Sequence, residues 1–190
     1  MNNPSTSSGQ AGRAAIILDT GAASRGSGNA NTNKEKDVRK WFVEQDLIEG
    51  VIYLPENLFY NTTAPGIILF LNNAKPEERK GKVFLLNASR EFAKGDPKNY
   101  IPDDAIARIA ETFKTWNEVG DGRDRPFSRI VSREEIAKND FNISPSRYIH
   151  TGAGEEYRSI VEIVEELNAL DEEAKETDRS LRAVLEKICL

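Results

Sequence analysis

The sequence predicts an α/β fold whose central strands are covered on both faces. Three continuous apolar runs carry this prediction, at 14–18, 51–54 and 67–71. None of them alternates apolar with polar residues, as a strand with one face in water would. Helical patterns lie between and after these runs, which is typical of folds in which helices pack on the faces of a sheet.

The first third of the chain predicts a tail, a strand, a loop and a helix in turn. Residues 1–12 are rich in Ser, Asn and Gly and predict a disordered tail. The strand at 14–18 turns at Asp19, and 21–33 reads as a flexible loop. Asn33 is placed to cap a helix, and Gly50 to end it. The apolar face expected for this helix consists of Val38, Trp41 and Phe42.

The middle of the chain predicts more strands and two helices. Pro55 ends the second strand, a loop spans 55–65, and strands follow at 67–71 and 82–86. A helix with apolar residues at steps of three and four starts at Pro102 and runs to about Val119. Residues 120–132 read as a loop. Ser132 followed by Glu135 is a capping-box pattern for a short helix, and 139–149 reads as irregular or extended.

The stretch 155–190 has a heptad-like apolar stripe and predicts a long helix. The stripe can fold back on its own domain or pack against helices of another chain. Asp171 and Asp178 interrupt it and favour a specific partner, because a buried acid is costly unless a partner satisfies it. The residues expected to pack on that partner are Ile160, Val164, Leu167, Leu181, Leu185 and Ile188.

The charge and rare residues exclude several classes of function. The formal net charge is −5, so any nucleic-acid contact needs a local basic patch or a partner. One cysteine and one histidine cannot form a zinc cluster, and they leave no disulfide framework, which fits a cytoplasmic location. No apolar run is long enough for a membrane span. The glycines of 21–28 lack the lysine that a phosphate-binding P-loop requires.

Two local features are candidates for ligand contact. Arg123, Arg125 and Arg129 lie in the segment expected to be a loop, where they could contact phosphates. Acidic neighbours make a solvated, salt-bridged loop the alternative. Phe59 and Tyr60 follow a strand end, where aromatic rings can stack on a flat ligand. Their alternative role is to anchor the loop in the core.

Five stretches resemble the methylase (M) subunit of type I restriction–modification systems. They are Gly12–Leu18, Val38–Pro55, Glu56–Thr63 with Gly66–Leu71, Val83–Arg90 and Asn139–Tyr148, and together they extend over about 12–150. The resemblance implies part of a Rossmann-like methyltransferase sheet with flanking helices. It also implies methylation of adenine N6 in DNA by S-adenosylmethionine. Phe59 falls where the family places an aromatic ring on the flipped adenine, and Tyr60 is the second candidate.

The resemblance also implies partners and an incomplete site. A DNA-specificity (S) subunit would pack against the C-terminal helix, and a restriction (R) subunit would join the full complex. The family's glycine-rich cofactor loop and Asn-Pro-Pro-aromatic loop precede the strand equivalent to 14–18, and neither occurs here. Asp19 stands where the family usually has proline. We therefore expect no cofactor binding and no activity from this chain alone.

These observations predict a division into a tail (1–12), the C-terminal part of the methyltransferase domain (13–150) and a partner-binding helix (155–190). Such a part would expose a sheet edge and tend to form a homodimer through it. The alternative is a non-catalytic regulatory module that competes for the S subunit and has a closed sheet edge. No nucleophile or acid–base constellation supports an unrelated enzyme.

Overall fold

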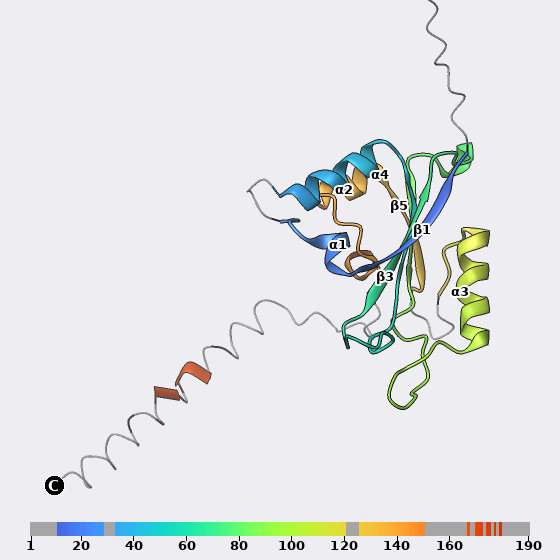
Figure 1. The fold of residues 1–190 in the computed structure, drawn as a ribbon. Helices are drawn as coiled ribbons and strands as arrows, with labels where there is room; N and C mark the ends of the chain where they lie inside the picture. Colours follow the sequence, from blue (N-terminus) through green and yellow to red (C-terminus); the bar gives the residue numbers. More distant parts are fainter. Residues whose placement is uncertain are drawn as a thin grey trace, which may run out of the picture. The chain divides into compact units, whose positions relative to one another are not determined.

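The computed structural model describes residues 11–28, 33–120 and 126–150, together with 167, 170–172, 174, 175, 177 and 179. The expected tail therefore lies almost wholly outside the described residues. The chain divides into two compact units, Met1–Thr151 and Gly152–Leu190. The first unit contains a mixed sheet with helices on both faces (Figure 1).

The sheet has five strands in the order β1-β3-β2-β4-β5. β3 is antiparallel to both of its neighbours, β2 is parallel to β4, and β5 is antiparallel to β4. β1, β2 and β4 therefore run in the same direction, and their carboxyl ends lie at one end of the sheet. The strands are β1 (Arg13–Asp19), β2 (Ile48–Tyr53), β3 (Gly66–Asn72), β4 (Lys82–Asn87) and β5 (Ser128–Ser132).

The helices cover the two faces of the sheet unequally. One face carries α1, α2, α4 and α5, and the other carries α3 (Figure 1). A single 3-10 turn, η1 (Glu77–Arg79), precedes β4. The helices are α1 (Gly21–Ser24), α2 (Lys34–Glu44), α3 (Asp103–Thr115), α4 (Arg133–Lys138) and α5 (Pro145–Tyr148).

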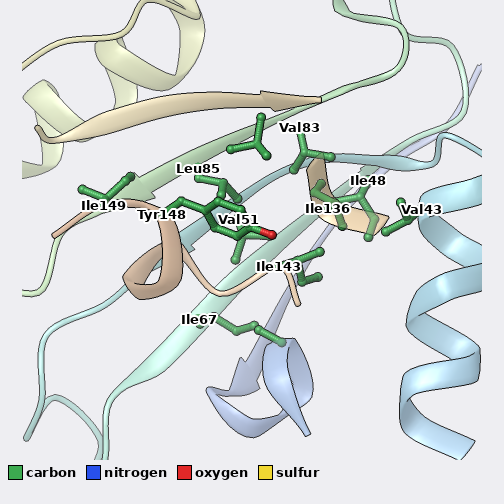
Figure 2. Close-up of a cluster of buried hydrophobic side chains, with 12 residues drawn as sticks. Val43, Ile48, Val51, Ile67, Val83, Leu85, Ile136, Ile143, Tyr148 and Ile149 are labelled. Atoms are coloured by element: carbon green, nitrogen blue, oxygen red, sulfur yellow. The ribbon is translucent and has the colours of Figure 1, made fainter. Parts of the chain in front are cut away.

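The core consists of two apolar layers, one on each side of β2 and β4. Val51 and Leu85 belong to the first layer, which Figure 2 shows beneath α2, α4 and α5. Ile52 and Phe84 face the second layer, under α3. Both strands are almost wholly buried, so the prediction of strands covered on both faces is confirmed for the centre of the sheet.

The prediction of a buried strand at 14–18 is wrong. Six of the seven residues of β1 are exposed, and Ile17 is 61% exposed. The reason is position, because β1 is an edge strand that pairs only with β3 among the described residues. Its apolar composition matches that of a central strand, although its place in the sheet does not.

The prediction for α2 is correct at its start and only partly correct for its buried face. The side chain of Asn33 caps the helix by accepting from the backbone N–H groups of Glu35 and Lys36. The buried residues are Arg39 and Val43. Of the residues expected on the apolar face, Phe42 is half-buried and packs against the core, whereas Val38 and Trp41 are 57% and 52% exposed.

Gly50 does not end α2. The helix stops at Glu44, and Asp46 turns the chain in a left-handed conformation with φ of 56°. Gly50 lies inside β2, where an added Cβ would come within 2.7 Å of the Phe113 ring. Packing under α3, rather than helix termination, therefore requires glycine there.

Further along the chain, the sequence missed one strand and overextended one helix. β5 lies within the stretch expected to be a loop. The strand was missed because polar residues flank its two apolar positions, Ile130 and Val131. α3 ends at Thr115, and Trp116 adopts a left-handed conformation with φ of 56°. The capping-box prediction is confirmed, since the Ser132 hydroxyl accepts from the Glu135 N–H at 3.1 Å.

Candidate functional site

A shallow cavity of about 310 Å³ opens where β1 ends and β3 begins. Strand carboxyl ends are the usual place for ligands in α/β sheets. The lining is mostly apolar, with one carboxylate and one hydroxyl group. It consists of Ile17, Leu18, Asp19, Phe59, Thr62, Ala64, Pro65 and Gly66.

Phe59 forms one wall of this cavity. Its side chain is half-buried and packs at the rim of the core layer under α3. The ring lies directly over Gly66, where an added Cβ would be only 2.8 Å from Phe59 Cε2. The ring therefore anchors the loop and also lines the cavity, and its stacking on a flat ligand stays a prediction.

Tyr60 has a different environment from Phe59. It is 86% exposed and is not part of the cavity lining. The structure therefore separates the two aromatic candidates, and only Phe59 is placed to contact a ligand in this cavity.

The loop that carries Phe59 is held by hydrogen bonds to a second loop. Asn57, in a left-handed conformation with φ of 57°, donates its N–H to Thr63 O at 2.9 Å. Lys98 Nζ donates to Asn57 Oδ1 at 2.9 Å, and the Asn99 N–H donates to Asn57 O at 3.0 Å. These bonds fix the loop that precedes the aromatic pair.

Asp19 supplies the only carboxylate in the cavity lining. Its Oδ1 accepts the Gly21 N–H at 2.9 Å and pairs with Arg25. The hydrogen bond from Arg25 holds the pKa of Asp19 below its ordinary value, so the group is an anion at neutral pH. The loop after β1 therefore begins at an anchored negative charge.

The loop after β1 is tied down by Arg39, a residue that sequence reasoning missed. Arg39 Nε donates to Phe141 O at 2.6 Å, and its Nη atoms donate to the carbonyls of Ala22 and Arg25 and to Ser27 Oγ. Burial lowers the pKa of Arg39. No local pattern signals this role, because one arginine on a polar helix usually lies in solvent.

Asp140 also holds the loop after β1 in place. It accepts the Gly28 N–H at 2.6 Å and pairs with Lys36 at 2.5 Å. The segment expected to be a flexible loop is thus fixed over its described part, 21–28. The sequence predicts no phosphate-binding loop here, and the Gly28 N–H is already bonded to Asp140.

Of the three arginines expected to contact phosphates, the structure describes only Arg129. Arg123 and Arg125 lie outside the described residues. Arg129 belongs to β5, where it pairs with Glu135 at 2.9 Å and lies 5.9 Å from the centre of the Tyr148 ring. It therefore has a structural partner in this fold, and its phosphate role stays a prediction.

The C-terminal stripe is described only in part. Leu167 is helical and 61% exposed, and Leu170 is 56% exposed within its own unit. The other residues expected to pack on a partner, Ile160, Val164, Leu181, Leu185 and Ile188, lie outside the described residues. Within the part of the chain that the structure describes, no helix is long and apolar enough to cross a membrane.

Comparison with known proteins identifies the class of this fold and site. The family model for N-6 DNA methylases matches residues 5–157. The chain is 45% identical over 179 residues to the type I restriction enzyme MjaVIII methylase subunit of Methanocaldococcus jannaschii. It is 34% identical over 181 residues to the HindI methylase subunit of Haemophilus influenzae.

The chain belongs to the N-6 DNA methylase family, and the relatives named above are methylase subunits of type I restriction enzymes. A crystal structure of the type I methyltransferase subunit from Streptococcus thermophilus matches 74% of the chain with a TM-score of 0.62 and 32% identity. The predicted fold class, a partial methyltransferase-type α/β sheet, is confirmed.

The chain is much shorter than these relatives. The alignment with the MjaVIII subunit includes 93% of this chain but only 29% of that protein. The alignment with the HindI subunit includes 39% of that protein. It likewise spans 27% of the Streptococcus thermophilus chain.

Proposed function

We propose that the chain supplies the C-terminal part of an adenine-N6 methyltransferase domain in a type I methylase subunit. Residues 13–150 would form that part and 155–190 a helix that docks on an S subunit. The observation that carries the proposal is the Phe59 ring, held over Gly66 at the wall of an open cavity. An adenine extruded from DNA could stack on this ring.

The cavity suits an adenine base better than a whole cofactor. Its lining is largely apolar, and its one charged residue, Asp19, is already paired with Arg25. S-adenosylmethionine carries an ammonium and a carboxylate that both need partners. This lining offers no such pair of groups. The lining of this cavity therefore does not fit the cofactor, and we propose that further methylase polypeptide binds it.

The exposed edge of β1 supports the same interpretation. Ile16 and Ile17 are 40% and 61% exposed on a seven-residue strand with an unpaired edge among the described residues. An adjoining cavity of about 410 Å³ between β1 and α2 is lined by apolar side chains that include Leu69 and Leu71. Such a surface is typical of one that further polypeptide covers.

The partners proposed for the complex follow from the family. An S subunit would select the DNA sequence, an R subunit would join the full complex, and DNA would be bound through the assembly. The complex would act in the cytoplasm. A non-catalytic module that competes for the S subunit is the second candidate, but it requires a closed sheet edge, and β1 is open over its described length.

The stacking role of Phe59 can be tested with 2-aminopurine, a fluorescent adenine analogue that is quenched when it stacks. The free 2-aminopurine nucleoside, which is unstacked and bright in solution, would be titrated with the chain. We expect quenching by the wild type and by Phe59→Tyr, but not by Phe59→Ala. Equal quenching by Phe59→Ala would contradict the proposal, and Trp41→Ser, a change on the exposed face of α2, is the matched control.

A further inference from the structure

We propose that two braced loops at the carboxyl end of the sheet contact the DNA nucleotides that flank the target adenine. These tyrosine loops are residues 55–65 and 93–100, and Figure 1 shows them at the same end of the first unit. The proposal rests on the proposed function and adds the chain's own DNA-contacting residues to it.

Each tyrosine loop presents an aromatic ring to solvent. Tyr60 is 86% exposed and Tyr100 is 55% exposed. Neither ring belongs to the two apolar core layers of the first unit. Aromatic rings held in solvent at a nucleic-acid site stack on bases of any sequence. This suits a methylase subunit if another subunit reads the recognition sequence.

Hydrogen bonds join the two loops into one scaffold. Ala93 and Tyr100 exchange backbone hydrogen bonds of 2.9 and 3.1 Å, which closes the second loop as a hairpin. The Asn99 side chain donates to Glu56 O at 3.0 Å, in addition to the bonds of Asn99 and Lys98 to Asn57. The two rings are thus presented from a fixed base, which reduces the entropy lost on binding.

The surroundings of the loops also provide unpaired positive charge. Arg90 and Lys94 are exposed, and neither forms an ion pair with any residue that the structure describes. The nearby Glu91 is neutralised by Arg108. These two cations have no ion-pair partner among the described residues and are placed to contact phosphates, although the same loops also carry the exposed carboxylates of Glu56 and Asp96.

The position of the loops connects them to the adenine cavity. Tyr60 follows Phe59 directly and stands between two lining residues of the cavity, Phe59 and Thr62, without being part of the lining. A base that enters the cavity leaves its two neighbours in the strand outside it. Those neighbouring nucleotides would then meet Tyr60 and Tyr100, with Arg90 and Lys94 on their phosphates.

The test uses the full ¹⁵N-labelled chain and a short duplex with a central adenine opposite an abasic site. We expect amide shifts in both tyrosine loops and at Phe59 and Gly66. The Tyr60→Ser, Tyr100→Ser double variant should bind about ten-fold or more weakly. The Arg90→Ala, Lys94→Ala double variant should reduce the salt dependence of binding by about two phosphate contacts.

Two matched controls change exposed residues away from the loops. Trp41→Ser removes an exposed ring on α2, and Lys138→Ala removes an exposed cation on α4, which follows β5 at the opposite end of the sheet. Both should bind like the wild type. Equal weakening by a control and by its loop counterpart would overturn the proposal.

The outcomes separate this proposal from the proposed function. If Phe59 and Gly66 shift and the tyrosine loops do not, the loops are not a DNA surface and the adenine site stands. If the loops shift and Phe59 does not respond to the adenine, the adenine site is wrong and the DNA surface stands. Loop shifts caused by an S subunit, with none caused by DNA, would assign the loops to a protein partner and overturn the proposal.

Discussion

Gly66 determines where the Phe59 ring can lie. An added Cβ would be 2.8 Å from Phe59 Cε2 and 3.3 Å from the backbone oxygen of Leu18. The ring can move only by leaving the cavity wall. The family resemblance identified Phe59 as an aromatic site residue, but it did not indicate that a glycine on another strand positions the ring.

We therefore predict that Gly66→Ala destabilises the first unit by about 1–3 kcal/mol, as overpacking does. Urea unfolding would measure this change. The Phe59→Ala, Gly66→Ala double variant should be less destabilised than the sum of the two single variants, because the small side chain removes the clash. Additive effects would show that the glycine has another role.

Tyr148 makes stability depend on alkaline pH. It is 6% exposed, its hydroxyl donates to Asn142 O at 2.6 Å, and burial raises its pKa to about 12. In the unfolded chain the pKa is about 10. The unfolded state therefore loses this proton first, and the contribution of Tyr148 is complete below pH 10 and falls as pH rises towards 12.

The expected loss is about 3 kcal/mol as pH rises from 10 through the folded-state pKa of about 12. Tyr148→Phe should lack this part of the pH dependence, although it loses the hydrogen bond at every pH. Urea unfolding of both proteins from pH 9 to pH 12 would compare their slopes. Parallel declines would contradict the shifted pKa.

At the scale of elements, β1 shows what a local pattern cannot predict. Ala14–Leu18 has the composition of a central strand, and the strand was predicted correctly. Its exposure depends on strand order, which is set by pairing with β3, a segment about 50 residues away. The same limit applies to α2, where Arg39 is buried because carbonyls from two distant loops converge on it.

The elements that were predicted well are specified by residues within or next to the element itself. The cap at Asn33, the capping box at Ser132 and the apolar runs of β2 and β4 are all local. The cavity beside Phe59 was not predictable from composition, since it needs β1, β3 and a loop together. Its aromatic residue was a candidate from its place at a strand end, and the family resemblance favoured Phe59 over Tyr60.

The open edge of β1 leads to a prediction about association. We expect the chain to self-associate at micromolar concentrations, because an exposed apolar strand pairs readily with another strand. Ile17→Lys should shift the population to monomer, as measured by light scattering. Ile106→Lys, a similar change on the exposed side of α3, is the control. A wild type that stays monomeric would favour the regulatory module.

At the scale of the whole molecule, the second unit leads to a prediction about the partner. We expect the chain to co-elute with an S subunit of a type I system in gel filtration. Leu167→Glu should weaken this complex about ten-fold or more, since it places a charge on the proposed packing stripe. The Lys175→Ala variant, on the same unit but outside that stripe, should behave like the wild type. Separate elution of the wild type would count against docking.

The central claim is that this chain supplies the adenine-binding part of a methylase that other polypeptide completes. Its most direct test is methyl transfer to adenine N6 by the MjaVIII methylase subunit from which the segment matched by this chain has been deleted. With an S subunit present, adding the chain should restore methylation, and adding Phe59→Ala should not. If the polypeptides co-elute but no methylation returns, or if the chain methylates DNA alone, the account is wrong.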